Sequence, residues 1–443
     1  MERFDVIIIG AGPGGYEVAA ELAASGACVA IVERDKAGGT CLNRGCIPTK
    51  CLCATASRAL EARNAAEFGV NVGGVSVDYA AARKRMLQVV DNLRDGVRAV
   101  LGDVRYIQGD ATINPDGSIS VAGEQFAADK TLIATGSRPS RPNIPGIENA
   151  ITSDELLERD MPLPARLIIV GGGVIGIEFA SIYNALGSKV TVVEYCKEIL
   201  PQFDADIAKR LRMALKARGV DFFTGAAVKS IGEDGSVVCD TRKGAVTIGG
   251  DLVLVATGRT PVVPQGVAEA GIELDERGFI VVDDALCTTR PGFYAAGDVT
   301  GICMLAHAAA AQARRALLPE AADVELDIIP SAVFSVPEAA MVGLTAAQCE
   351  AHGAEYLECK ATYAANGKAQ ADGCPAGVVK IVYSPATRLI LGVHVLGEHA
   401  SDIVAEAAAL MYGMVTVDDL ASDLVHGHPT LSEILQAAAK TAK

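Results

Sequence analysis

Two cysteines near the N-terminus, Cys41 and Cys46, have a spacing that could support redox chemistry. They lie in the segment GGTCLNRGCIPTK, which spans 38–50. Two thiols can form a disulfide that accepts an electron pair and is later re-formed. In a regular helix, residues five apart have Cα atoms about 8.6 Å apart, beyond the roughly 6.8 Å that a disulfide spans. A bond between them therefore needs an irregular turn, and strained exposed disulfides are the most easily reduced.

Spacing alone does not select this pair, because Cys46 and Cys51 are also five residues apart. Pro48 favours Cys41 as the partner of Cys46, since its ring disfavours helical geometry at the residue before it. The glycines that precede Cys41 also make its approach flexible. Two unrelated buried thiols remain an alternative. Lys50 lies one helical turn beyond Cys46, where its ammonium could favour a thiolate nearby. The alternative, which is more usual for a lysine on a helix surface, is that its ammonium is simply solvated by water.

The C-terminal segment HGHPTLSEILQ carries a candidate base, His428, followed directly by Pro429. The proline predicts an extended His428 just before a helix, and this helix carries Glu433. A neutral histidine held by a carboxylate can take a proton from a thiol near neutral pH. Thr430 and Glu433 also match the T-x-x-E pattern of a capping box. The residues alone favour the catalytic and the structural interpretation of Glu433 equally.

An internal repeat indicates the elements that position these groups. The stretch VIIIGAGPGGYEVAAELAASGACVAIVE (6–33) recurs without a gap as LIIVGGGVIGIEFASIYNALGSKVTVVE (167–194). Each copy predicts a strand, a glycine turn, a helix and a second strand that ends in glutamate. Such turns let backbone N–H groups approach a pyrophosphate, and the acidic residue accepts a ribose hydroxyl. Glycine turns used only for packing are the alternative. The residues concerned are Gly10, Gly12, Gly15 and Glu33, then Gly171, Gly173, Gly176 and Glu194.

Length and composition indicate the fold class. Half of the 443 residues are apolar, 46 are glycine and none is tryptophan, which is typical of helices packed closely on sheets. We predict an α/β protein with two Rossmann-like dinucleotide-binding domains and a C-terminal α+β domain. The predicted segments are 1–145 for the first nucleotide domain, 146–270 for the second, 271–327 for a return to the first, and 328–443 for the C-terminal domain.

The net charge and the pattern of cysteines exclude several classes of protein. The net charge of −15 would repel nucleic acid and anionic membranes. No run of about 18 apolar residues could span a bilayer, and the N-terminal apolar run leads straight into a glycine motif, unlike a signal peptide. The cysteines lack both the pattern of a disulfide scaffold and the spacing of a zinc site. We therefore predict a cytoplasmic protein with no metal and no nucleic-acid or membrane partner.

The segment 38–50 resembles the active-site signature of the pyridine nucleotide-disulfide oxidoreductases, and the resemblance covers essentially the whole chain. It implies a redox disulfide in which Cys41 faces the substrate and Cys46 faces the flavin. It also implies FAD in the first module and a nicotinamide cofactor in the second. The implied FAD contacts are Gly10, Gly12, Gly15, Glu33, Lys50, Ala111, Asp298 (to the ribityl chain) and Ala306. The implied nicotinamide-cofactor contacts are Gly171, Gly173, Gly176, Glu178 (paired with Lys50), Glu194 and Gly258.

The C-terminal HPTLSE resembles the catalytic motif of the same family. That resemblance implies that His428 is the acid/base and that Glu433 orients its imidazole. In relatives this histidine comes from the other subunit, so a homodimer is implied, with 328–443 as the dimerisation domain.

Further residues narrow the choice within the family. Glu194 favours NAD over NADP, because a carboxylate repels a 2′-phosphate and no arginine follows it closely. No cysteine occurs after Cys374, which argues against a mercuric reductase. The segments 364–373 and 392–408 most resemble members that oxidise dihydrolipoamide. Lipoyl domains of an acyltransferase or of a glycine-cleavage carrier protein are then the implied partners.

Two other functions stay open from the sequence. One is an NADH-dependent reductase of another disulfide or of a small acceptor. The other is a non-catalytic, flavin-bearing subunit in which the disulfide acts as a redox sensor. Arg44, Cys51 and Cys53 are departures from the family pattern that put side reactions in question.

Overall fold

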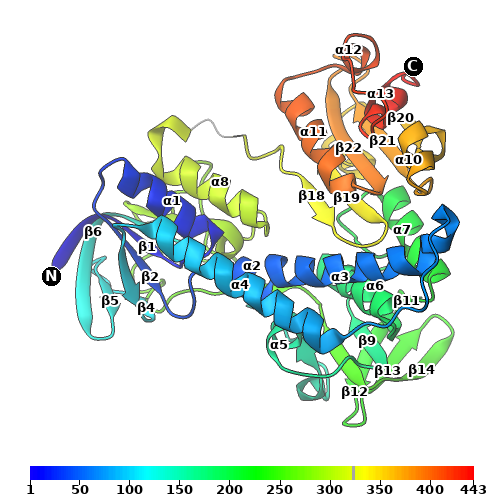
Figure 1. Ribbon diagram of the computed structural model, residues 1–443. Helices are drawn as coiled ribbons and strands as arrows, with labels where there is room; N and C mark the ends of the chain where they lie inside the picture. Colours follow the sequence, from blue (N-terminus) through cyan, green and yellow to red (C-terminus); the bar gives the residue numbers. More distant parts are fainter. Residues whose placement is uncertain (322–324) are drawn as a thin grey trace.

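Figure 1 shows three lobes, each built on its own β-sheet, in a computed structural model that describes residues 1–321 and 325–443. Within these residues no helix has the length and apolar character needed to cross a membrane. Nor does the described part of the chain contain a cluster of His, Cys, Asp and Glu side chains that could hold a metal ion.

The first lobe is a sheet in the order β3-β2-β1-β6-β5-β4, with β17 added beside β6. β1 lies between β2 and β6 and pairs with both in parallel, so its VIII run is buried on both faces. Helices α1 and α8 pack against each other over this sheet. The bounds are β1 Glu2–Ile9, α1 Pro13–Ala24, β2 Val29–Glu33, β3 Arg105–Gln108, β4 Ala111–Ile113, β5 Ile119–Val121, β6 Glu124–Ile133, β17 Phe293–Ala295 and α8 Ala306–Leu317.

The second lobe repeats this plan. Its parallel sheet has the order β11-β10-β9-β15-β8, with the antiparallel sheet β12-β13-β14 beside it. Helix α6 ends at Gly187, which adopts the left-handed conformation typical of a helix C-terminus. The bounds are β8 Ile151–Thr152, α5 Ser153–Glu158, β9 Arg166–Val170, α6 Val174–Leu186, β10 Lys189–Glu194, α7 Ala205–Ala217, β11 Asp221–Thr224, β12 Ala227–Ile231, β13 Ser236–Thr241, β14 Gly244–Gly249 and β15 Leu252–Val255.

The third lobe is an antiparallel sheet in the order β18-β19-β22-β21-β20, with helices packed against it. The bounds are β18 Ser331–Val333, β19 Glu338–Gly343, α9 Ala346–His352, β20 Leu357–Thr362, α10 Gly367–Ala371, β21 Val378–Tyr383, β22 Ile390–Gly397, α11 Ala400–Tyr412, α12 Val417–Ser422 and α13 Glu433–Ala439. The α/β class with a C-terminal α+β domain is therefore confirmed. The domain boundaries themselves stay a prediction.

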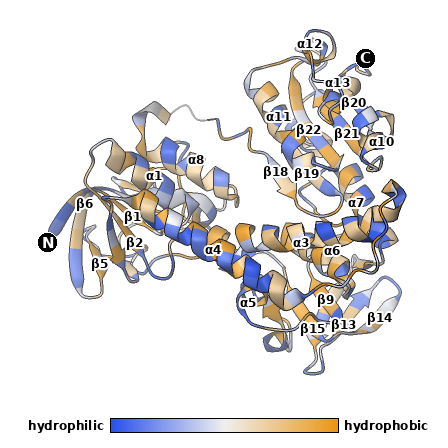
Figure 2. Cartoon of the chain, in the orientation of Figure 1, coloured by the Kyte–Doolittle hydropathy of each residue, from blue (hydrophilic) through white to orange (hydrophobic). Residues whose placement is uncertain are grey.

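Two connections join the first lobe and the second lobe. Strands β7 (Ser137–Pro139) and β16 (Arg259–Pro261) pair with each other where the chain leaves and re-enters the first lobe. The helices α2 (Gly39–Arg44), α3 (Cys46–Asn64) and α4 (Tyr79–Leu101) form the other connection, and α3 packs on α6 of the second lobe. In Figure 2 the hydrophobic residues run along the strands, and α4 shows a hydrophilic side to solvent.

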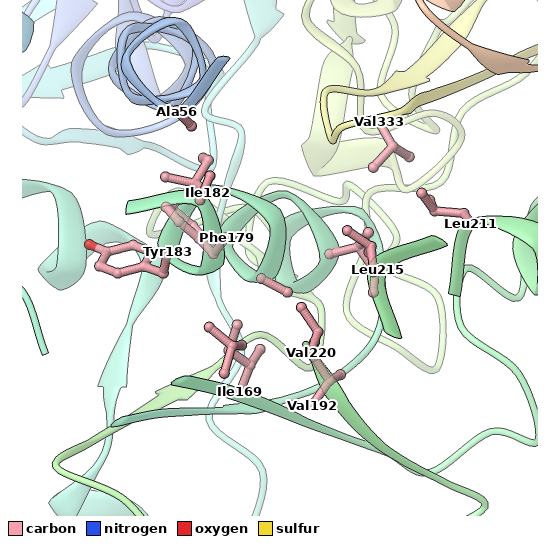
Figure 3. Close-up of a cluster of buried hydrophobic side chains, with 14 of the residues drawn as sticks. Ala56, Ile169, Phe179, Ile182, Tyr183, Val192, Leu211, Leu215, Val220 and Val333 are labelled. Atoms are coloured by element: carbon pink, nitrogen blue, oxygen red, sulfur yellow. The ribbon is translucent and has the colours of Figure 1, made fainter. Parts of the chain in front are cut away.

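A single apolar cluster unites parts of all three lobes. Figure 3 shows Phe179 of α6 packed between the second sheet and Ala56 of α3. Val333, the last residue of β18, belongs to the same cluster. The segments around α3, α6 and β18 therefore share one close-packed core, which limits their relative motion.

Candidate active site

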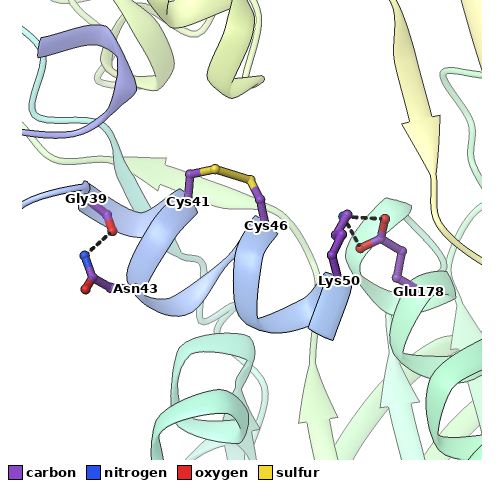
Figure 4. Close-up of a disulfide and its surroundings, with 6 residues drawn as sticks. All are labelled: Gly39, Cys41, Asn43, Cys46, Lys50 and Glu178. Atoms are coloured by element: carbon purple, nitrogen blue, oxygen red, sulfur yellow. Dashed lines mark hydrogen bonds and ion pairs between the residues drawn. A yellow bond between two sulfur atoms is a disulfide. The ribbon is translucent and has the colours of Figure 1, made fainter. Parts of the chain in front are cut away.

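Cys41 and Cys46 form a disulfide at the junction of α2 and α3 (Figure 4). Their Cα atoms are only 4.7 Å apart, because the helix is interrupted at Gly45. A Cβ atom on Gly45 would lie 2.9 Å from the carbonyl oxygen of Thr40, so this position requires glycine. The expected irregular turn is present, and Cys41 is the partner of Cys46, but the argument from Pro48 for this choice was wrong. The residue before Pro48 is helical, and the proline lies in the first turn of α3, where its missing N–H costs nothing.

The neighbouring thiols are not alternative partners. Cys51 is free and buried in the shared apolar core. Cys53 is also free, and its Sγ lies 3.3 Å from the carbonyl oxygen of Phe334. Burial, followed by the charge of Glu178, raises the pKa of the Cys53 thiol to about 12. A thiol that stays protonated is a poor nucleophile, so Cys53 does not compete with the disulfide, and burial keeps Cys51 away from substrates.

Side chains that the sequence did not single out hold the disulfide segment in place. The amide of Asn43 donates to the carbonyl oxygens of Ala37 (3.0 Å) and Gly39 (2.9 Å). Its own oxygen accepts a hydrogen bond of 2.8 Å from Arg94 of α4. Arg44, an unexpected residue between the cysteines, pairs instead with Asp35 and Glu158.

Lys50 and Glu178 form the ion pair that the family resemblance implies. The Lys50 Nζ atom lies 3.0 and 3.1 Å from the two carboxylate oxygens of Glu178. Lys50 projects from the same side of α3 as Cys46, as Figure 4 shows. The Glu178 side chain is buried and the Lys50 side chain is 33% exposed, so the pair places a cation beside the redox disulfide.

In the two glycine turns, some glycines are required by the fold, whereas others leave open space for a ligand. A Cβ atom on Gly15 would lie 1.9 Å from the carbonyl oxygen of Gly10, and on Gly176 it would lie 2.0 Å from that of Gly171. These glycines allow the helix to pack on the strand. Gly173 is different, because its backbone is extended and a Cβ atom would meet nothing within 4 Å.

Gly12, the counterpart of Gly173, has the same backbone conformation, with only the Cα atom of Gly39 at 3.8 Å. Neither the fold nor the packing explains glycine at these two helix N-termini. Open space in front of free N–H groups fits the pyrophosphate of a dinucleotide. The residues therefore fit the two cofactors.

The two glutamates lie at the ends of β2 and β10, as the repeat predicts. Glu33 accepts hydrogen bonds of 2.8 Å from the N–H groups of Ala11 and Asp35. Glu194 likewise accepts from the N–H groups of Gly172 and Cys196. Both carboxylates are thus fixed beside their glycine turns, with lone pairs left for a hydroxyl group.

Asp298 lies in a short 3₁₀ turn after β17 and is half-buried. It accepts a hydrogen bond from the hydroxyl of Ser137, which in turn accepts one of 2.6 Å from Arg259. The Arg259 Nε atom lies 3.7 Å from the Asp298 carboxylate. The half-buried Ala111 and Ala306 begin β4 and α8, and the exposed Gly258 precedes β16.

His428 and Glu433 are joined by a contact of 3.0 Å between Nδ1 and Oε1. The second carboxylate oxygen accepts a hydrogen bond of 2.8 Å from the N–H of Thr430. This N–H first, and His428 second, lower the pKa of Glu433. The predicted capping box is not complete, since Ser432 is the N-cap residue of α13. Glu433 therefore serves both the turn and the imidazole.

The chain does not bring His428 to its own disulfide, because His428 lies in the third lobe before α13 (Figure 1). Its side chain is 79% exposed, so its free Nε2 faces outward and is available to a second copy. The nearby His426 differs, since its side chain is only 7% exposed and contacts Glu406 at 2.8 Å.

Comparison with known proteins agrees with this geometry. The family model described as pyridine nucleotide-disulphide oxidoreductase matches residues 4–313, and its dimerisation domain matches residues 329–439. The chain belongs to the pyridine nucleotide-disulphide oxidoreductases. As a member it is an NAD-dependent FAD oxidoreductase, and its dimerisation domain supports assembly as a homodimer.

Named relatives make the similarity more specific. The dihydrolipoyl dehydrogenase of Bacillus subtilis is 38% identical over 475 residues and covers 99% of this chain and 98% of the relative. The dihydrolipoyl dehydrogenase of Chlamydia muridarum is 35% identical and covers 100% of this chain and 97% of the relative. Among solved structures, the HOCl-induced flavoprotein disulfide reductase RclA from Escherichia coli has a TM-score of 0.86 and 32% identity, covering 99% of this chain and 100% of that one. A Cu(II) complex of RclA has a TM-score of 0.87, 31% identity and full coverage of both chains.

Proposed function

We propose that this protein oxidises protein-bound dihydrolipoamide to lipoamide and passes the electrons to NAD, as a dihydrolipoamide dehydrogenase. The observation that carries the proposal is the combination of the Cys41–Cys46 disulfide with the exposed His428–Glu433 pair. A disulfide can accept electrons from many donors, but a dithiol substrate also needs a base that makes its thiolate. Full-length similarity to dihydrolipoyl dehydrogenases supports the same choice.

The reaction begins with a proton transfer. His428, kept in one orientation by Glu433, accepts the proton of one substrate thiol at its Nε2 atom. The thiolate attacks Sγ of Cys41, the Cys41–Cys46 bond breaks, and Cys46 leaves as a thiolate. The second substrate thiol then attacks the sulfur that the substrate has bound to Cys41. Lipoamide leaves as a cyclic disulfide, the proton of the second substrate thiol passes to the departing Cys41 sulfur, His428 keeps the first proton, and two electrons remain on the cysteine pair.

Other residues keep the pair ready for this exchange. The Lys50 ammonium, held by Glu178, favours the anionic form of Cys46 because both lie on one side of α3. When bound, FAD would supply the chemistry that links the two-electron reduced cysteine pair to hydride transfer with NAD. FAD would be held by Gly10, Gly12, Gly15, Glu33, Lys50, Ala111, Asp298 and Ala306. NAD would be held by Gly171, Gly173, Gly176, Glu178, Glu194 and Gly258.

We propose a division of labour between the subunits and a set of partners. The segments 1–145 and 271–327 would hold FAD, 146–270 would hold NAD, and 328–443 would present His428 to the disulfide of the other subunit. The physiological substrates would be lipoyl domains of an acyltransferase or of a glycine-cleavage carrier protein in the cytoplasm. The net charge of −15 suits docking to a basic segment of such a complex.

Replacement of Cys41 by serine tests the proposal. The variant should lose lipoamide turnover, because no disulfide remains for the substrate to attack, yet still oxidise NADH with an artificial electron acceptor. Steady-state assays with NADH and either lipoamide or that acceptor give both activities. Unchanged lipoamide turnover in the variant would refute the assignment.

The second candidate is an NADH-dependent reductase of another acceptor, which the similarity to RclA favours. Lipoamide, glutathione disulfide, a quinone and Cu(II) can be compared as acceptors with the isolated protein. We expect lipoamide to be preferred, with a dependence on His428 that a metal ion or quinone would not share. A flavin-bearing sensor without catalysis would turn over none of them at an appreciable rate.

A further inference from the structure

The ammonium of Lys50 has a second neighbour besides Glu178. Its Nζ atom lies 4.2 Å from the centre of the Phe334 ring, within the range of a cation–π contact. Phe334 follows directly after β18, so it comes from the third lobe. The contact point therefore joins three parts of the molecule: α3 through Lys50, the second lobe through Glu178 and the third lobe through Phe334.

The backbone of Phe334 is fixed independently of its ring. Its N–H donates a hydrogen bond of 2.9 Å to Glu178 Oε1, and its carbonyl oxygen lies 3.3 Å from the Cys53 Sγ atom. Two residues on, the N–H of Val336 donates a hydrogen bond of 2.9 Å to the hydroxyl of Ser181. A change confined to the ring therefore leaves the attachment of this segment to α3 and α6 intact.

The ring is not needed to fill the core. The preceding residue, Val333, is fully buried in the shared apolar cluster, whereas Phe334 is half-buried and faces Lys50. Lysine has a long, flexible side chain, and fixing it costs conformational entropy. A single ion pair with Glu178 restrains this side chain from one direction only. A second contact on another side of the ammonium restricts it further.

We propose that Phe334 is a positioning residue that holds the Lys50 ammonium on the Cys46 side of α3. Glu178 fixes the ammonium by charge, and the aromatic face fixes it by its negative quadrupole. The charge that favours the Cys46 thiolate then stays in place while substrates exchange. This inference rests on the role proposed above for Lys50 and adds a residue from the third lobe to it.

Replacement of Phe334 by leucine or tyrosine tests the contact. Leucine keeps an apolar side chain without an aromatic face, whereas tyrosine keeps the face. Phe68→Leu, at the end of the 3₁₀ helix Ala65–Phe68 that follows α3, is the matched control because its side chain is exposed. The measurement is an anaerobic NADH titration of the purified holoenzyme, with the long-wavelength absorbance of a thiolate against flavin recorded at the two-electron stage.

In Phe334→Leu the apparent equilibrium constant for forming that species should fall about 2- to 30-fold, the range of a cation–π contact. Phe334→Tyr should stay within about twofold of the native protein, as should Phe68→Leu. In a Lys50→Met background, Phe334→Leu should have no additional effect, because both changes act through one group.

A native value in Phe334→Leu, or an equal loss in leucine and tyrosine variants, would overturn the inference. So would an undiminished effect in the Lys50→Met background. Lipoamide turnover by the native protein is measured alongside. If lipoamide is not turned over but the leucine and tyrosine variants still differ, the proposed substrate fails and the role of Phe334 stands.

Discussion

Replacing Glu433 with glutamine isolates the charge that supports the base. Glu433 makes two contacts, one to Nδ1 of His428 and one to the N–H of Thr430. A glutamine oxygen can serve one of these donors, but its NH₂ group would then face the other. The variant therefore loses a charge-assisted bond to the imidazole while keeping almost the same shape.

The expected loss follows from the strength of such a bond. Hydrogen bonds to charged groups contribute about 1.5–3 kcal/mol, and each 1.36 kcal/mol changes a rate tenfold. The dithiol reaction should therefore slow about 10- to 150-fold. His428 is 79% exposed in the single chain, so screening by water places the expectation toward the lower end of this range. The lowered pKa of Glu433 keeps it ionised throughout the neutral range, so its own titration should not limit the rate there.

Rapid mixing with dihydrolipoamide measures the affected half-reaction, and rapid mixing with NADH measures the half-reaction that does not use His428. The nearby pair of His426 and Glu406 offers a matched control. Glu406→Gln removes the same charge from a contact with a buried histidine. Glu406→Gln should keep the dithiol rate within about threefold. An equal loss in both variants, or an equal loss in both half-reactions, would contradict the role given to Glu433.

Three other predictions follow from contacts elsewhere in the chain. Gly173→Val should fold normally but weaken NADH binding more than tenfold without releasing FAD, as measured by equilibrium titration. Gly176→Val should not fold, because its Cβ would lie 2.0 Å from a carbonyl oxygen. The opposite pattern in the two variants would refute the assignment of the second glycine turn. Lys380→Met should lower the free energy of unfolding by about 3–5 kcal/mol, because it leaves Asp204 and Glu358 without their buried partner, and a loss below about 1 kcal/mol in denaturant titrations would contradict this. Burial lowers the pKa of His394 from its ordinary 6.5, so the stability that the neutral imidazole contributes is present above pH 6.5 and is lost as the pH falls below that value. Between pH 7.5 and 5.5 the unfolding temperature should therefore drop less steeply in His394→Gln than in the native protein. Equal slopes in the two proteins would contradict this prediction.

Local patterns were enough to predict the nucleotide-binding lobes. The repeat placed Glu33 and Glu194 at strand ends, because a strand, a glycine turn and a helix are each determined by neighbouring residues. The same logic placed Cys46 and Lys50 on one side of a helix. Family membership and the fold class predicted from the sequence are both confirmed by the comparisons.

Contacts between distant segments could not be predicted in this way. Phe334 reaches Lys50 across most of the chain, and Lys380 on β21 reaches Asp204 at the start of α7. Neither pair has a spacing that a sequence pattern can reveal, because each contact exists only after separate lobes have packed together. An irregular turn was predicted between the two cysteines, but its location at Gly45 was not, for a different reason. It depends on the carbonyl oxygen of Thr40 approaching too closely for any side chain, which spacing does not show.

Thiol mapping after reduction by one equivalent of NADH tests the central claim most directly. The native holoenzyme is mixed anaerobically with NADH, quenched in acid, alkylated and analysed by peptide mass. The account predicts that Cys41 and Cys46 become alkylated together, while labelling of the free cysteines, Cys51 and Cys53 among them, does not change. A flavin that is reduced while Cys41 and Cys46 remain joined would contradict it.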